Sequence, residues 1–389
     1  MNLSSRMQGV RGEGAFEVLV KARALAAQGR DIIHMEIGEP DFPTPPNIIE
    51  AAKKALDAGY TKYGATQGDP ELRQIIADEV ARTRGIEVTE DRVVVTPGAK
   101  PILFYTMLTL LEAGDEAIYP NPGFPIYESM IRYTGATPVA MPLVEERGFS
   151  LDLDKFRESL TDRTKLIILN SPQNPTGGTI PPEDIKAIAD LVRDRDLVVL
   201  TDEVYSRIWF DEQPTSIASL PGMAEKTIVL DGFSKTFSMT GWRMGYGVYP
   251  KWLVAPVCLL MVNSASHTAS FSQRAGIEAL TGPQDAVTAM VAEFKRRRDL
   301  IVEGLNKIPG FSCAKPGGAF YAFPNITKTG IEAGELADRV LDEAGVSCLS
   351  GESFGAYGKG YLRFSYATSY DQIERALERI DKLMRGILG

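Results

Sequence analysis

Lys235 is the residue whose surroundings in the sequence point most directly to chemistry. It follows a strand-like run at 227–230 and is the only cation between Gly232 and Arg243, among apolar, hydroxyl and glycine residues. A desolvated amine with a second cation nearby has a lowered pKa and becomes a usable nucleophile. A lysine that forms a Schiff base needs this property. An isolated lysine is more commonly a solvated charge, and this alternative stays open from the segment alone.

Three further polar loops follow apolar, strand-like runs, and ligands of open α/β sheets bind at such strand ends. The first, T-P-G-A-K-P at 96–101, leads into a helix whose free N–H groups would suit a phosphate or simply begin a helix. It matches neither the dinucleotide nor the nucleoside-triphosphate motif. The second, N-P-T-G at 174–177, predicts a turn, with or without a function. In the third, Asp202 could cap the next turn or hold a cofactor's ring nitrogen protonated.

Arg363 lies inside an apolar, strand-like run, L-R-F-S. A guanidinium is costly to bury unless it is paired, and its planar shape matches a carboxylate with two hydrogen bonds. The sequence therefore predicts either an internal ion pair or a binding site for a carboxylate.

The composition excludes several other chemistries. Only two histidines, His34 and His267, occur in 389 residues, which excludes a three-histidine zinc site, and we expect no metal. The three cysteines form no C-x-x-C pair, and the net charge of −9 comes with no basic tract. The first 14 residues lack the apolar stretch of a secretory signal, and no apolar run approaches the ~20 residues of a membrane span. We expect a soluble, cytoplasmic protein that binds no nucleic acid.

Apolar runs alternate with amphipathic segments, which predicts an α/β fold with a mainly parallel sheet flanked by helices. The expected strands are 92–96, 116–119, 137–141, 165–170, 197–201 and 227–230, and the expected helices include 101–112, 126–134 and 182–195. After residue 282 the pattern changes to helix 285–307, strand 319–323, helix 334–344 and strand 361–366, typical of a smaller α+β domain. We therefore expect a large domain at 47–284 and a small domain built from 1–46 and 285–389.

Taken together, the motifs N-P-T-G, T-D-E-V-Y, S-K-T-F-S-M-T-G-W-R-M-G-Y and L-R-F-S-Y-A, in this order along the chain, resemble the class I/II aminotransferases of fold type I, which use pyridoxal 5′-phosphate. The similarity runs from the G-E-P at 38–40 to Arg363, nearly the whole chain, and it is greatest to the aspartate/aromatic/alanine branch. The resemblance implies that Lys235 forms the Schiff base with the cofactor and then shuttles the substrate's α-proton. It also implies that Asp202 pairs with the pyridine nitrogen.

The resemblance assigns the remaining cofactor contacts residue by residue. Asn174 and Tyr205 would hydrogen-bond the phenolic oxygen, and Phe124 would stack on the ring unless it is a core aromatic. The phosphate would be held by the amides of Ala99 and Lys100, by Ser234 and Arg243, and by Tyr63 of a neighbouring subunit in a homodimer with shared active sites. The sequence departs from the family at Gly232, where many relatives carry serine, and this puts the contact of Ser234 in doubt.

The resemblance makes Arg363 the clamp for the substrate α-carboxylate, helped by Asn174 and the backbone at Gly38. The expected reaction exchanges an amino group between an L-amino acid and a 2-oxo acid by a ping-pong mechanism. Apolar residues such as Phe16, Ile37 and Tyr321 leave the substrate side chain open.

Two alternatives belong to other classes. A C–S lyase of the same fold, catalysing β- or γ-elimination, would share the cofactor residues but release ammonia without an added oxo acid. A DNA-binding regulator fused to this fold is disfavoured, because only about 45 residues precede the first helix of the large domain and they carry no basic winged helix.

Overall fold

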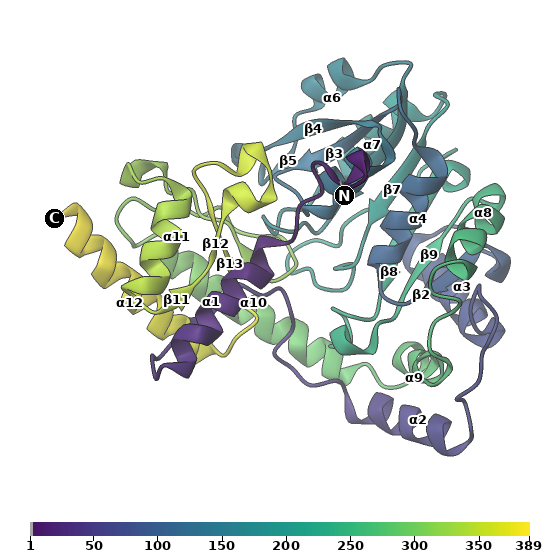
Figure 1. Ribbon diagram of the computed structural model, residues 1–389, viewed down its shortest axis with the longest axis horizontal. Helices are drawn as coiled ribbons and strands as arrows, with labels where there is room; N and C mark the ends of the chain where they lie inside the picture. Colours follow the sequence, from purple (N-terminus) through teal and green to yellow (C-terminus); the bar gives the residue numbers. More distant parts are fainter. Residues whose placement is uncertain (1–2) are drawn as a thin grey trace.

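The structure is a computed structural model that describes residues 3–389, and an eight-stranded sheet forms its larger part (Figure 1). The strand order is β2-β9-β8-β7-β6-β3-β4-β5. The strands are β2 Val93–Thr96, β3 Glu116–Asn121, β4 Thr137–Val144, β5 Ser150–Leu151, β6 Thr164–Asn170, β7 Val198–Asp202, β8 Thr227–Gly232 and β9 Gly245–Val248. The neighbours β4, β3, β6, β7 and β8 run parallel, which confirms the predicted α/β fold.

The central strands are buried on both faces, which explains why they read as continuous apolar runs. Strand β9 was not predicted: its sequence G-Y-G-V has two glycines, and it lies antiparallel between β2 and β8. Strand β5, only two residues long, was also missed.

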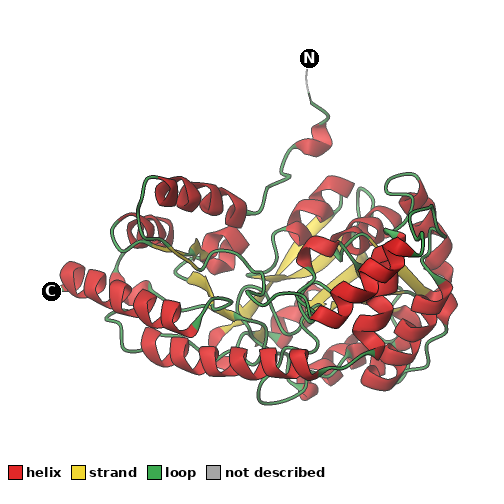
Figure 2. Ribbon diagram, turned by 90° about the horizontal axis from the view of Figure 1, so that it is seen from below, coloured by secondary structure: helices red, strands yellow, loops and turns green. Residues whose placement is uncertain are grey.

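Helices cover both faces of this sheet, and Figure 2 shows them outside the strands. One face, which carries Leu200 and Leu230, packs against α4 Lys100–Leu110, α5 Ile126–Thr134 and α8 Lys251–Val262. The opposite face, which carries Val199 and Val229, packs against α2 Pro46–Asp57, α3 Pro70–Arg84, α6 Leu153–Ser159, α7 Pro182–Val192 and α9 Ser270–Thr281. Neighbouring residues of one strand therefore face different helical layers.

A smaller part contains two short sheets, with the orders β10-β13-β12 and β1-β11. Its strands are β1 Ile33–His34, β10 Tyr321–Ala322, β11 Val346–Ser347, β12 Leu349–Ser350 and β13 Leu362–Ser365, and its helices are α1 Gly14–Ala27, α10 Asp285–Leu305, α11 Ala333–Asp342 and α12 Tyr370–Leu388. The N-terminal region joins this part through β1, and it also reaches the larger part, where the Arg11 amide donates to Ser129 Oγ at 3.1 Å. Met1 and Asn2, with which the expected small domain begins, lie outside the described residues.

The N-P-T-G turn connects the two parts of the chain. Gly177 has a φ of +69°, and its carbonyl accepts the amides of Gly317 and Gly318 at 2.9 and 3.0 Å. A Cβ at Gly177 would lie 2.6 Å from Pro316 Cβ, so the close approach requires glycine. Within residues 3–389, no helix has the length and hydropathy needed to cross a bilayer.

Candidate active site

A cavity of about 440 Å³ lies between the carboxyl ends of the central strands and the smaller part. Nearly all the residues predicted from the sequence line this one space. They are Gly38, Ala99, Lys100, Phe124, Asn174, Asp202, Tyr205, Ser234, Lys235, Arg243 and Arg363. The apolar residues Phe16, Ile37 and Tyr321 line it as well.

Lys235 lies just beyond the end of β8 with its amine inside the cavity. Its Nζ donates a hydrogen bond to the Gly38 carbonyl and lies 5.9 Å from the centre of the Phe320 ring. Burial lowers the pKa of Lys235 to about 8; Glu39 opposes this shift, and the positive charges of Arg363 and Lys100 add to it. A lowered pKa was expected, but with Arg243 as the nearby cation. Arg363 and Lys100, which folding brings to the cavity from distant parts of the chain, act instead.

Asp202 is the last residue of β7, and its carboxylate is buried. Tyr127 donates to its Oδ2 at 2.6 Å, and the Val204 amide donates to its Oδ1 at 3.3 Å. Burial raises the pKa of Asp202 to about 6, against the lowering effect of these two hydrogen bonds. The sequence did not single out Tyr127, because an aromatic residue on the first turn of a helix is typical of an apolar core. Its position three residues after Phe124 is the only signal that could have found it.

The start of α4 and the loop after β8 form the opposite wall. Helix α4 has no side-chain cap at its N-terminus, so its first amides are free for an anion. Gly98, with a φ of +93°, lies against Arg243, and a Cβ there would lie 2.4 Å from Arg243 Nη2. Ser234 lines the cavity, whereas a Cβ at Gly232 would lie 3.1 Å from Gly245 Cα, within the sheet.

Arg363 is buried in β13 and aims its guanidinium into the cavity. Its Nη1 donates to Asn174 Oδ1 at 3.1 Å, its Nη2 donates to the Glu36 carbonyl, and its Nε is buried without a partner. The guanidinium lies 4.7 Å and 4.8 Å from the ring centres of Tyr321 and Phe354. Within residues 3–389 no carboxylate forms an ion pair with it, so of the two predicted alternatives the geometry favours a carboxylate site.

Tyr205 and Tyr63, two further residues of the expected site, differ in where they lie relative to the cavity. The Tyr205 hydroxyl lies 2.7 Å from the Tyr321 hydroxyl at the cavity wall. Tyr63 lies outside the cavity: it is 90% exposed, and its ring centre lies 5.5 Å from that of His267. The N-terminal segment adds Glu13, which pairs with the Lys100 amine and which the glycine-rich sequence around it gave no means to predict.

Comparison with known proteins agrees with this geometry. The chain matches the family "Aminotransferase class I and II" over residues 30–380. It is 40% identical over 365 residues to an aspartate aminotransferase of Pyrococcus abyssi, covering 93% of this chain and 94% of the relative. It is 39% identical over 364 residues to aromatic-amino-acid aminotransferase 2 of Thermococcus litoralis, covering 92% of this chain and 93% of the relative. The aspartate aminotransferase of Thermus thermophilus with maleate has a TM-score of 0.93 at 36% identity, covering 98% of this chain and 100% of that one.

The chain belongs to the class I and II aminotransferases, and it is an aminotransferase enzyme of fold type I. The resemblance found in the motifs is thereby confirmed. Members of this family generally depend on pyridoxal 5′-phosphate and act on amino acids and keto acids.

The charge of Glu39 gives a direct test of the lysine environment. Because this carboxylate raises the pKa of Lys235, Glu39→Gln should lower the pKa below about 8 and leave more free amine at neutral pH. The measurement is the pH dependence with which a small amine-reactive reagent modifies Lys235 in cofactor-free protein, followed by mass spectrometry. The control is Glu50→Gln on α2, whose carboxylate lies by Lys53. An unchanged or higher midpoint for Glu39→Gln contradicts the assignment.

Proposed function

We propose that the cavity binds pyridoxal 5′-phosphate and that Lys235 carries the chemistry of amino transfer between an L-amino acid and a 2-oxo acid. The observation that carries this proposal is the placement of a desolvated lysine, a buried carboxylate and a buried arginine without an acidic partner around one cavity. When bound, the cofactor supplies an electron-poor ring that accepts the electron pair released as the α-hydrogen leaves.

The donor set fits this cofactor at both of its ends. The amides of Ala99 and Lys100, with Ser234 and Arg243, would hold the phosphate, since a helix start and a guanidinium both favour an anion. Asp202 would accept a hydrogen bond from the protonated pyridine nitrogen. Its pKa of about 6 keeps the carboxylate largely ionised at neutral pH.

The ring itself would rest on side chains from neighbouring elements. Asn174 and Tyr205 would hydrogen-bond its phenolic oxygen, and Phe124 would stack on its face. Phe124 and Tyr127 already meet edge to face with centres 5.8 Å apart, so the stacking residue and the residue that holds Asp202 brace each other.

Lys235 would move the substrate proton. A lysine with a pKa of about 8 holds a much larger fraction of neutral amine at neutral pH than an ordinary lysine does, so it can accept the proton from the α-carbon. Arg363 would hold the α-carboxylate with two hydrogen bonds, aided by Asn174 and the Gly38 backbone. The unpartnered Nε of Arg363 supports this role, because a bound carboxylate would satisfy it.

We also propose a homodimer in which Tyr63 reaches the phosphate of the neighbouring subunit. Three observations support an interface near this residue. Tyr63 is 90% exposed, α8 presents Trp252, Leu259 and Val262 outward, and the Ser270 hydroxyl ties the Lys62 carbonyl to the start of α9 at 2.9 Å. Exposed apolar side chains gathered in this way are typical of an interaction surface.

Within each subunit we propose a large domain at 47–284 and a small domain formed by 1–46 with 285–389. The core around Phe294, Phe320 and Phe364 is distinct from the cores beside the large sheet, although Tyr205, Ile208 and Phe210 of the large domain also pack into it, and this supports the division. We place the enzyme in the cytoplasm, because Cys258, Cys313 and Cys348 are all free thiols.

Replacement of the lysine tests the proposed function. Lys235→Ala should lower turnover by about 10²–10⁴-fold or more and remove the visible absorbance band of bound pyridoxal 5′-phosphate. Lys226→Ala is a matched control, because burial lowers the pKa of Lys226 as well. The Lys226 amine donates to backbone carbonyls at the end of α7, outside the cavity. Retention of both turnover and absorbance in Lys235→Ala would sink the proposal.

Replacement of the arginine tests the substrate class. Lys cannot reproduce the two-pronged contact, so Arg363→Lys should raise the KM for amino acid and oxo acid by about 10–100-fold without changing the cofactor absorbance. Arg298→Lys, a change at another buried arginine that pairs with Asp211, serves as control. An equal KM in Arg363→Lys and wild type contradicts the clamp.

Complementation tests the shared active site. Lys235→Ala and Tyr63→Ala chains, co-expressed and purified as the mixed dimer through two different tags, should regain activity above that of either parent. One site of that dimer then holds both Lys235 and the partner chain's intact Tyr63. The absence of any gain, or a single-chain mass near 42.5 kDa for the wild type, contradicts the proposal.

A further inference from the structure

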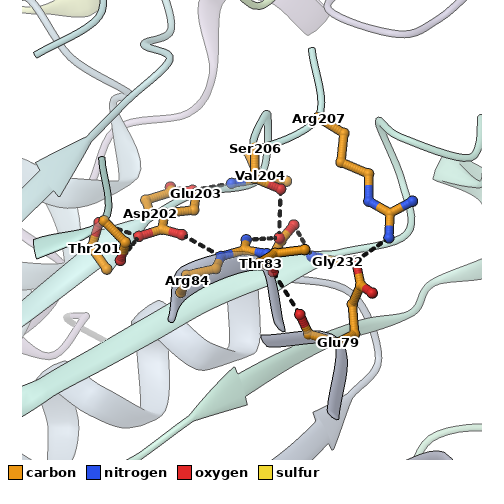
Figure 3. A network of polar contacts seen from close by, with 12 residues as sticks. Glu79, Thr83, Arg84, Thr201, Asp202, Glu203, Val204, Ser206, Arg207 and Gly232 are labelled. Carbon is orange, nitrogen blue, oxygen red and sulfur yellow. Dashed lines mark hydrogen bonds and ion pairs between the residues drawn. The ribbon is translucent and has the colours of Figure 1, made fainter. Parts of the chain in front are cut away.

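A buried ion network lies directly behind the active site, on the opposite face of the large sheet (Figure 3). Its centre is Arg84, the last residue of α3, whose side chain is only 6% exposed. Arg84 Nε donates to Glu203 Oε2 at 2.9 Å, and its Nη2 donates to Asp231 Oδ2 at 2.5 Å. The third nitrogen, Nη1, donates to the Thr83 hydroxyl at 2.7 Å. Each of the three guanidinium nitrogens therefore donates a hydrogen bond.

The carboxylates of Glu203 and Asp231 also accept hydrogen bonds from neighbouring hydroxyl and amide groups. Glu203 Oε1 accepts the hydroxyls of Thr201 and Ser216 at 3.1 and 2.5 Å. Asp231 accepts the Ser206 hydroxyl at 2.8 Å and the Gly232 amide at 2.7 Å. Satisfied buried networks of this kind hold one geometry, because every alternative arrangement leaves a polar group unpaired.

The network connects the two strands that carry the key groups of the cavity. Glu203 follows Asp202 at the end of β7, and Asp231 lies in β8 four residues before Lys235. The strands pair in parallel with Asp202 opposite Leu230, and the Glu203 amide donates to the Leu230 carbonyl at 2.8 Å. Asp202 and Leu230 line the active-site cavity, whereas Thr201 and Glu203 line a second cavity of about 400 Å³ on the other face.

Charge also connects the network to the site. The groups that act on Asp202 are Tyr127 from α5 and the Val204 amide, which donate hydrogen bonds to it, and the carboxylates of Glu203 and Asp231, which act through the sheet by their charge. After burial, these two carboxylates are what raises the pKa of Asp202, and Arg84 is the cation that lies between them. Burial alone would lower the pKa of Arg84, but the attraction of Glu203 and Asp231 outweighs burial and raises it, so Arg84 stays charged.

We propose that Arg84 is a positioning residue for amino transfer, which holds Asp202 and the loop bearing Lys235 in register from the far face of the sheet and compensates the two carboxylates beside Asp202. The inference rests on the proposed function, since it concerns the hold of Asp202 on the cofactor. A buried ion triad contributes little net stability compared with apolar packing, so geometry and local charge are the properties that it supplies to the site.

The test compares Arg84→Met with a matched buried arginine. Arg92→Met is the control. The side chain of Arg92 is 8% exposed, pairs with Glu225 and donates to the Tyr249 carbonyl. Arg92 lies just before β2, away from the cavity. Both variants should lower the thermal midpoint of the holoenzyme. Only Arg84→Met should speed the loss of pyridoxal 5′-phosphate from the holoenzyme, by about tenfold. This is the effect expected if the Arg84 network and the position of Asp202 are energetically coupled. Equal rates of cofactor loss in the two variants overturn the inference.

The pH midpoint of cofactor release gives a second measurement. A purely structural role of Arg84 would leave this midpoint unchanged. Arg84→Met leaves two uncompensated carboxylates, so Asp202 should protonate at higher pH, and the acid midpoint of cofactor release should rise. Glu203→Gln removes one of these charges while Arg84 keeps Asp231, so its midpoint should fall. If Arg84→Met does not fold, Arg84→Gln, which also removes the charge but keeps a polar side chain, and Glu203→Gln provide the same comparison. Shifts of the same sign, or no shift, overturn the inference.

The wild-type spectrum separates this inference from the proposed function. A wild-type enzyme without the cofactor band overturns the proposed function and the role of Arg84 with it. A wild-type enzyme that shows the band, together with an Arg84→Met variant whose cofactor release matches wild type, overturns only the role of Arg84.

Discussion

The burial of charged groups of both signs at the carboxyl edge of the large sheet is the constraint on which the rest of the structure depends. Lys235 is desolvated, and Asp202 and Arg363 are buried; among residues 3–389 none of these three side chains forms an ion pair. Such groups persist only where the surrounding polar partners are fixed. Tyr127 and the Val204 amide fix Asp202, Asn174 and two aromatic rings fix Arg363, and the Gly38 carbonyl holds Lys235.

These supports come from different parts of the fold, and the layering of the sheet explains how they converge. Successive residues of β7 and β8 alternate between the cavity and the opposite helical layer. Asp202 therefore faces the cavity while its neighbour Glu203 faces Arg84. One short strand thus joins the active site to a buried network in which Arg84 pairs with Glu203 and Asp231.

Much of the fold and most of the site could be predicted from sequence, because both depend on local patterns. Apolar runs mark strands such as β6 and β7, and the polar residues that follow them, Asn174 and Asp202, necessarily gather at one sheet edge. Contacts between distant segments could not be predicted. Tyr127 and Arg84 look like ordinary helical residues until α5 and α3 are placed on opposite faces, and Arg363 becomes the cation beside Lys235 only after β13 is docked. Glycine-rich β9 carries no strand pattern at all.

The pairing of β1 with β11 brings together residues that are more than 300 positions apart in the chain. During synthesis Ile33 leaves the ribosome long before its partner Val346 exists, so β1 and β11 can pair only after most of the chain has been made. Arg363 follows Val346 and arrives later still. Under the function proposed above, the residue that recognises the substrate carboxylate is therefore among the last to be synthesised, and a nascent chain that lacks it cannot complete the proposed site.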